Sequence, residues 1–99
     1  MLYIGVDLGT SAVKLLLMDG SGRIHKVVSR EYPLYFPHPA WSEQNPEDWF
    51  TASMDGMKEL TSECDKSQVA GISFGGQMHG LVTLDQADEV IRPAILWND

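Results

Sequence analysis

Two apolar runs joined by a short polar bend open the chain, and they constrain its fold more than any other feature. Residues 2–6 form an apolar run that ends on Asp7, and residues 12–18 form a second one. Apolar runs of this length, bounded by turn residues, are typical of buried strands. The bend between them, residues 9–11, is Gly-Thr-Ser. The pattern predicts a strand, a tight turn and a second strand, with polar groups gathered at the turn.

The bend carries the residue types that bind the terminal phosphates of a nucleotide. Gly9 lets the backbone approach a ligand closely, and the N–H and hydroxyl groups of Thr10 and Ser11 can donate to phosphate oxygens. Lys14 adds a positive charge, and Asp7 can hold Mg²⁺ directly or through water. The alternative is an ordinary β-hairpin, since Gly, Thr and Ser are common turn residues. A lysine inside the second apolar run favours phosphate binding, although the sequence contains neither G-x-x-x-x-G-K-[ST] nor G-x-G-x-x-G.

Composition excludes several classes of protein. The chain has 14 acidic and 7 basic residues, for a net charge of −7, and it has no basic patch that would indicate nucleic-acid binding. Its one cysteine, Cys64, excludes an internal disulfide and fits a reducing compartment. Asp7 interrupts the first apolar run, and no run approaches 18 apolar residues. We therefore expect no signal peptide, no membrane partner and a cytoplasmic location.

The first half of the chain predicts a β-meander followed by a helix. Strands are expected over residues 2–8, 12–18 and 23–32, followed by a proline-rich loop over residues 33–46. Asn45 is the expected N-cap of a helix that has Pro46 at its first position and extends to about Glu63. The expected apolar face of this helix comprises Trp49, Phe50, Ser53, Met57 and Leu60. Trp41 and Trp49 are expected to pack in the core or at the helix entry.

The second half predicts a strand over residues 69–74, buried and parallel to an earlier strand. Residues 75–80 are then expected to form a loop, and residues 81–84 and 90–92 a pair of strands. A meander, a helix and a returning parallel strand together predict an α/β fold with a mixed sheet. This is the opening of the ribonuclease-H-like fold of sugar kinases, hexokinases and actin.

The loop Gly75-Gly76-Gln77-Met78-His79-Gly80 is a second candidate site. Gln77 and His79 can hydrogen-bond hydroxyl groups, and Met78 offers an apolar contact to a carbon chain. The alternative is a flexible loop with one solvated histidine. Its place after a predicted strand favours a ligand site, because ligands of open α/β sheets bind beyond the carboxyl ends of strands.

Four segments resemble the FGGY family of carbohydrate kinases, and together they span the chain in order. The segments are residues 3–11 with Lys14, residues 41–49, residues 75–80 and residues 92–99. The first segment is generic to the wider superfamily, whereas the Gln-Met-His-Gly loop is the motif specific to this resemblance. Glycerol kinase relatives carry an Arg-Glu pair at the positions of Met78 and His79, so this chain departs from them.

The resemblance implies ATP- and Mg²⁺-dependent phosphorylation of a ketose, D-xylulose to D-xylulose 5-phosphate. It implies that Asp7 is the catalytic and metal-site carboxylate, and that the general base is an aspartate outside this chain rather than Asp99. The implied phosphate-binding residues are Gly9, Thr10, Ser11 and Lys14. The implied sugar-binding residues are Gln77, Met78, His79, Trp97 and Asn98.

The resemblance also implies that residues 1–99 are the amino-terminal part of the first of two kinase domains. The chain stops directly after an apolar run, which we interpret as a cut within a domain, so we expect the isolated chain to be inactive. Three alternatives remain: a kinase for ribulose, gluconate or glycerol, an actin-like or chaperone-like ATPase module, and a non-catalytic sugar-binding regulator. A homodimer is compatible with all of these.

Overall fold

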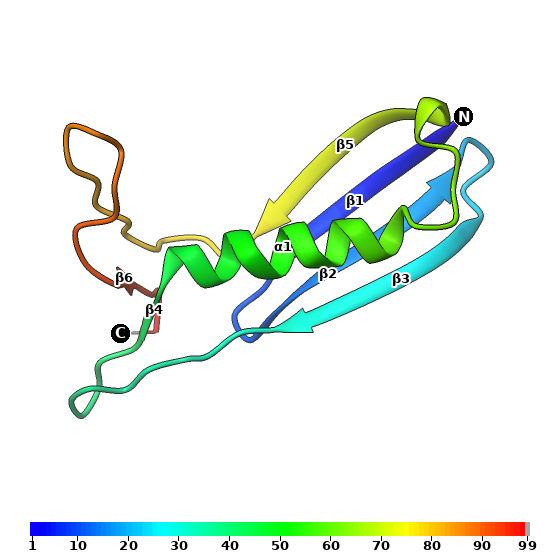
Figure 1. Cartoon of the computed structure of the whole chain (residues 1–99). Helices are drawn as coiled ribbons and strands as arrows, with labels where there is room; N and C mark the ends of the chain where they lie inside the picture. Colours follow the sequence, from blue (N-terminus) through cyan, green and yellow to red (C-terminus); the bar gives the residue numbers. More distant parts are fainter. Residues whose placement is uncertain (99) are drawn as a thin grey trace.

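The computed structural model describes residues 1–98, which form a mixed sheet with one helix along it (Figure 1). The sheet has four strands in the order β3-β2-β1-β5, and β4 pairs with β6 in a separate two-stranded sheet. The elements are β1 (Leu2–Leu8), β2 (Ala12–Asp19), β3 (Ile24–Glu31), β4 (Glu43–Gln44), α1 (Pro46–Leu60), a short 3₁₀ helix (Lys66–Gln68), β5 (Val69–Gly76) and β6 (Ala94–Ile95).

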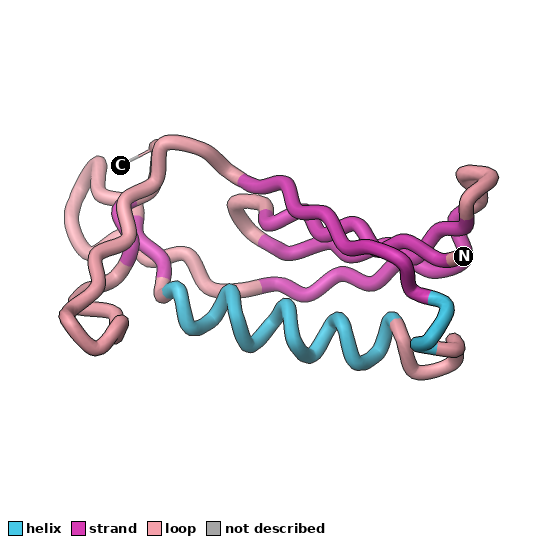
Figure 2. Tube along the Cα trace, turned by 90° about the horizontal axis from the view of Figure 1, so that it is seen from above, coloured by secondary structure: helices cyan, strands magenta, loops and turns pink. Residues whose placement is uncertain are grey.

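The predicted sheet topology is confirmed. β1 pairs antiparallel with β2, β2 pairs antiparallel with β3, and β5 lies parallel to β1. Alternate residues of the strands point to the helix, so Val6 and its partner Leu15 are buried beneath α1. Figure 2 shows α1 along one face of the sheet, with no other element of residues 1–98 over the opposite face. The core comprises Ile4, Val6, Val13, Leu15, Leu17, Val28, Tyr32, Ala52 and Leu60.

The helix begins as predicted but ends earlier. The side chain of Asn45 accepts a hydrogen bond from the Glu47 N–H at 3.0 Å, which caps the first turn. α1 ends at Leu60 rather than near Glu63. The hydroxyl of Thr61 donates to the Met57 carbonyl at 2.9 Å, and such local bonds compete with continuation of a helix.

The predicted apolar face of α1 was partly wrong, because the helix meets the sheet through its smallest residues. Ala52, Gly56 and Leu60 are its buried residues, whereas Phe50 is 64% exposed. A Cβ on Gly56 would lie 2.6 Å from Leu15 Cδ1. The close approach at Gly56 therefore turns Phe50 away from the core, while Trp49 and Met57 still pack against its edge.

Several predictions for the loops and the second half were also wrong. Gly75 and Gly76 belong to β5, and β5 is an edge strand whose Phe74 is exposed rather than buried. Residues 81–84 and 90–92 form no strands; they make only isolated bridges, Leu84 with Val90 and Leu81 with Ile95. The predicted proline loop contains β4, and Trp41 within it is exposed.

No helix among residues 1–98 combines the length and the apolar character needed to cross a bilayer.

Candidate active site

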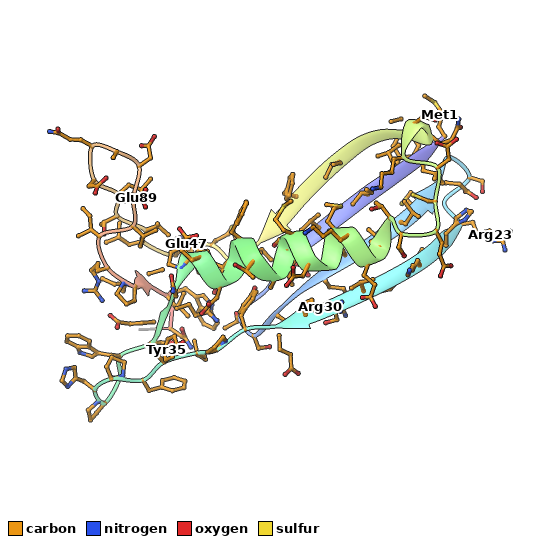
Figure 3. The ribbon with its side chains drawn as sticks, viewed as in Figure 1. Met1, Arg23, Arg30, Tyr35, Glu47 and Glu89 are labelled. Atoms are coloured by element: carbon orange, nitrogen blue, oxygen red, sulfur yellow. The ribbon has the colours of Figure 1, made fainter. Side chains whose placement is uncertain are left out.

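The sequence-predicted site residues gather at one end of the sheet. β1 and β5 are parallel, so their carboxyl ends lie side by side, and the β1–β2 turn follows directly from β1 (Figure 1). α1 begins at the same end of the sheet, and residues 77–98 lie beyond that end. Figure 3 shows Tyr35, Glu47 and Glu89 at this end and Met1 and Arg23 at the other. This end is where ligands of α/β sheets bind.

The β1–β2 turn, residues 9–11, is held tightly by backbone and side-chain bonds. The Gly9 N–H donates to the Ala12 carbonyl at 2.9 Å, and a Cβ on Gly9 would lie 3.0 Å from that oxygen. The hydroxyl of Tyr32 donates to the Gly9 carbonyl. Burial, with a further contribution from the negative charge of Asp7, raises the pKa of Tyr32 to about 12. The phenol therefore stays protonated and keeps donating to the turn at physiological pH.

Asp7 and Lys14 are partners in the β1–β2 register and point to the face of the sheet that α1 does not cover. Both side chains are exposed. On the other side of Asp7, its β5 partner is Gly75, where a Cβ would have no atom of the described chain within 4 Å. The carboxylate thus has open space beside it and a lysine across from it. This is an arrangement that a phosphate group with a cation can occupy.

The described residues suit Mg²⁺ held jointly with a nucleotide rather than a metal site built from protein ligands alone. Residues 1–98 contain no group of three or more His, Cys, Asp or Glu side chains placed to hold a metal ion. Mg²⁺ is commonly bound through one or two carboxylates together with phosphates and water. The single exposed carboxylate of Asp7, next to the Gly9 turn, fits that donor set.

Hydrogen bonds join the turn to the predicted sugar loop through Gln44. The Gln44 Nε2 donates to the Thr10 carbonyl at 2.5 Å, and the Gln44 Oε1 accepts from Gln77 Nε2 at 3.2 Å. Trp97 Nε1 lies 3.4 Å from the Thr10 hydroxyl as a hydrogen-bond donor. Three of the predicted site residues, Thr10, Gln77 and Trp97, are therefore brought together although they lie far apart in the sequence.

The remaining predicted sugar residues are exposed at the edge of this cluster. Met78, His79, Trp97 and Asn98 are all exposed in the described chain. His79 has a positive φ of 62°, a backbone conformation that non-glycine residues rarely adopt and that is often found at functional sites. Asn98 lines a hollow of about 510 Å³ with residues 36–42.

The Oε1 atom of Gln77 is buried, and no group of residues 1–98 donates a hydrogen bond to it. Unpaired buried acceptors are costly, so this oxygen is suited to a donor supplied from outside residues 1–98. A sugar hydroxyl is one such donor. The predicted role of Gln77 in sugar binding stays a prediction.

Sequence analysis missed Gln44, Tyr32 and the ion pair between Glu43 and Arg92. The Glu43 carboxylate is buried and bonds the Arg92 guanidinium, which ties β4 to the segment before β6. Ser42, Glu43 and Gln44 are three consecutive polar residues inside a proline-rich segment, a pattern that predicts an exposed loop. The only available signal was Gln44 itself, since an amide can both donate and accept and is therefore able to bridge segments.

Comparison with known proteins identifies the family. The model of the FGGY family of carbohydrate kinases, N-terminal domain, matches residues 2–99. The chain is 49% identical over 98 residues to the xylulose kinase of Bacillus subtilis and 33% identical over 96 residues to the gluconokinase of the same organism. These alignments cover 97% of this chain in both cases, and 20% and 19% of the two relatives.

Solved structures agree with the predicted fold. The crystal structure of a xyloylose kinase from Brucella ovis superposes with a TM-score of 0.94 at 44% identity, over 100% of this chain and 21% of that one. The actin- and hexokinase-like fold expected from the topology is thus confirmed. The chain spans about a fifth of the length of the relatives it matches. It belongs to the FGGY family of carbohydrate kinases.

Proposed function

We propose that the protein to which this chain belongs transfers the γ-phosphoryl group of ATP to D-xylulose, forming D-xylulose 5-phosphate. The observation that carries the proposal is the hydrogen-bonded junction at the carboxyl ends of β1 and β5. There Gln44 joins the Gly9–Ser11 turn to Gln77, and the Trp97 indole bonds Thr10 of the same turn. We propose further that residues 1–99 are the amino-terminal part of the first of two domains, and that the protein is cytoplasmic.

The turn is assigned to the nucleotide. The N–H and hydroxyl groups of Thr10 and Ser11 would donate to phosphate oxygens, and Lys14 would neutralise their charge. Asp7 would hold Mg²⁺, which when bound neutralises charge on the phosphates. Positioning and charge stabilisation account for most of the catalysis of phosphoryl transfer, so a rigid turn with a carboxylate beside it suits the task.

Residues 77–98 are assigned to the sugar. Gln77 and His79 would hydrogen-bond hydroxyl groups of the ketose, Met78 would contact its carbon chain, and Trp97 and Asn98 would form part of the pocket wall. The base that accepts the proton of the attacking hydroxyl is proposed to be an aspartate outside residues 1–99. The isolated chain is accordingly expected to lack kinase activity.

Gluconate is the second candidate substrate, because a specific observation favours it. Besides the Bacillus gluconokinase, the gluconate kinase of Lactobacillus acidophilus is 36% identical to this chain, with a TM-score of 0.93 over 99% of this chain and 20% of that one. The higher identity to the xylulose kinase of Bacillus favours xylulose. The Met78-His79 pair disfavours glycerol, and family membership favours a sugar kinase over an actin-like ATPase.

The test is a substrate panel with the full-length protein. ADP release is coupled to a spectroscopic assay with xylulose, ribulose, gluconate and glycerol as acceptors, with and without Mg²⁺. We expect the highest kcat/KM with xylulose, and ATP hydrolysis without sugar at a small fraction of that rate. A preference for gluconate, or ADP release independent of sugar, would contradict the proposal. Light scattering of the same sample determines whether the protein is a homodimer.

A further inference from the structure

We propose that Gln44 is a positioning residue that sets the placement of the sugar loop relative to the phosphate-binding turn. The inference rests on the proposed function, because it assigns the two segments to the two substrates. Gln44 itself contacts three parts of the chain and belongs to neither segment. Its proposed role is to hold the acceptor sugar at the distance and orientation that transfer of the γ-phosphate requires.

The side chain of Gln44 is fully buried and uses both ends of its amide. Its Nε2 donates to the Thr10 carbonyl at 2.5 Å. Its Oε1 accepts from Trp49 Nε1 at 3.0 Å and from Gln77 Nε2 at 3.2 Å. The three partners come from the β1–β2 turn, from α1 and from the loop after β5. One side chain thus bonds three segments that meet at the candidate site.

The backbone of Gln44 is itself held in place, so its side chain projects from a fixed position. Gln44 is paired with Ala94 in the β4–β6 sheet, and the Leu96 N–H donates to the Ser42 carbonyl at 3.0 Å. The neighbouring Glu43 bonds Arg92. These contacts also attach the segment that leads into Trp97, whose indole N–H reaches Thr10. Gln44 therefore bonds the turn and Gln77 through its side chain, and through its β4 neighbours it is attached to the segment that carries Trp97.

Only a side-chain amide satisfies these three partners. The Thr10 carbonyl needs a donor, whereas the indole N–H of Trp49 and the amide N–H of Gln77 need an acceptor. Glutamate supplies the acceptor but places an oxygen against the Thr10 carbonyl, and methionine supplies neither function at similar length. Because misplacement of about 1 Å can lower a rate on the order of 100-fold, loosening this residue should reduce turnover without removing any contact to substrate.

The experiment compares Gln44→Met and Gln44→Glu with wild type in the full-length protein. For each protein, kcat, the KM values for ATP and for sugar, and the melting temperature are measured. The acceptor is whichever sugar of the panel gives the highest kcat/KM. We expect Gln44→Met to lower kcat at least tenfold, with the KM for ATP changed less than about threefold. Gln44→Glu keeps the acceptor for Trp49 and Gln77 but loses the bond to the turn and places an oxygen against the Thr10 carbonyl, so it should lower kcat at least as much.

Two control variants separate positioning from general loss of stability. Leu60→Ala removes a buried side chain at the far end of α1, so it should lower the melting temperature while leaving kcat nearly unchanged below the transition. Gln68→Met makes the same chemical change at an exposed glutamine and should match wild type. If Gln44→Met is too unstable to assay, Gln44→Glu decides the question by the same comparison.

Two results would overturn the role of Gln44. One is a kcat within about twofold of wild type in Gln44→Met. The other is a loss of kcat that simply follows the melting temperature in both Gln44→Met and Leu60→Ala. A protein that prefers another sugar but shows the expected Gln44 effect would refute the xylulose assignment alone. Absence of phosphorylation of any sugar in the panel would refute both proposals.

Discussion

The β1–β2 turn and residues 77–98 belong to the same candidate site but are held in place in different ways. The turn follows from two strands that pair along their full length, over a core in which Val13 and Leu15 have no exposed surface. Residues 77–98 have a two-residue strand, two isolated bridges and the Glu43–Arg92 ion pair. The residues that would bind phosphate thus lie next to long paired strands, whereas those that would contact the sugar lie on a segment with little regular secondary structure.

This difference indicates how the fold can serve several substrates. Residues on a rigid scaffold keep the phosphate chemistry constant, while a loop beyond the strand ends can vary with little cost to the core. It also means that side-chain contacts, above all those of Gln44, carry more of the positioning in the second region than in the first. Substitutions in the two regions should therefore have separable effects on the two substrates.

The largest effect is expected at Asp7. Asp7→Asn keeps the size of the side chain but removes the negative charge beside the Gly9 turn, so the metal and phosphate charges are no longer balanced. We expect kcat at saturating sugar to fall on the order of 100-fold or more, from the general value of preorganised charge. Steady-state kinetics of the full-length variant check this. More than about half of the wild-type kcat would remove Asp7 from its proposed role.

His79→Ala should affect the sugar and spare the nucleotide. If His79 hydrogen-bonds a ketose hydroxyl, its loss leaves that hydroxyl unpaired and costs roughly 1–3 kcal/mol, which is about 5- to 150-fold in kcat/KM for xylulose. The KM for ATP should hardly change. Kinetics with each substrate varied in turn measure both. A defect in ATP alone, or no defect, would show that the loop is structural.

Glu43→Gln should weaken the attachment of residues 77–98 while the sheet stays intact. The substitution leaves the Arg92 guanidinium without its buried carboxylate. Because Arg92 is 39% exposed and partly solvated, we expect a loss of about 1–3 kcal/mol of stability, below that of a fully buried pair. Hydrogen exchange should accelerate in residues 81–95 and stay unchanged in β1 and β2. An equal increase in the exchange rate of residues 81–95 and of β1 and β2 would contradict the proposed difference between the two regions.

The smallest effect is expected at Tyr32, and it depends on pH. The pKa of Tyr32 is raised to about 12 in the folded chain, against about 10 when unfolded. The stability that the Tyr32 phenol contributes is therefore fully present below pH 10 and is lost as the pH rises toward 12. Tyr32→Phe removes the bond to Gly9 and should cost about 1 kcal/mol near pH 8. In urea unfolding, the difference in the free energy of unfolding between wild type and Tyr32→Phe should become smaller above pH 10. A difference that does not change with pH would contradict this.

The sheet could be predicted from the sequence because its information is local. The apolar runs on both sides of the Gly9 turn predict two strands, and the Asn45-Pro46 pair predicts a helix start, in each case from neighbours in the chain. β4 could not be predicted in this way, because Gln44 is buried by partners about fifty residues further along. Phe50 was misplaced because Gly56, which has no side chain, sets the contact of α1 with Leu15.

The residues of the candidate site also differ in whether they could be predicted from their neighbours in the sequence. Gly9, Thr10, Ser11 and Lys14 could be named as a group because they are consecutive or nearly so, and the structure places them on one hairpin. Their connection to the side chain of Gln77 depends on one buried amide in a segment that looks like an exposed loop, whereas Trp97 reaches the Thr10 hydroxyl directly. Nothing in the local pattern indicates which polar residue of such a segment is buried.

We propose that the turn binds phosphate and residues 77–98 bind sugar at one junction. A crystal structure of the full-length protein with D-xylulose, Mg²⁺ and a non-hydrolysable ATP analogue tests it most directly. We expect the γ-phosphate within hydrogen-bond distance of the Thr10 and Ser11 N–H groups, and the ketose in contact with Met78 and His79. A sugar bound away from residues 77–98, or a triphosphate away from the Gly9 turn, would contradict it.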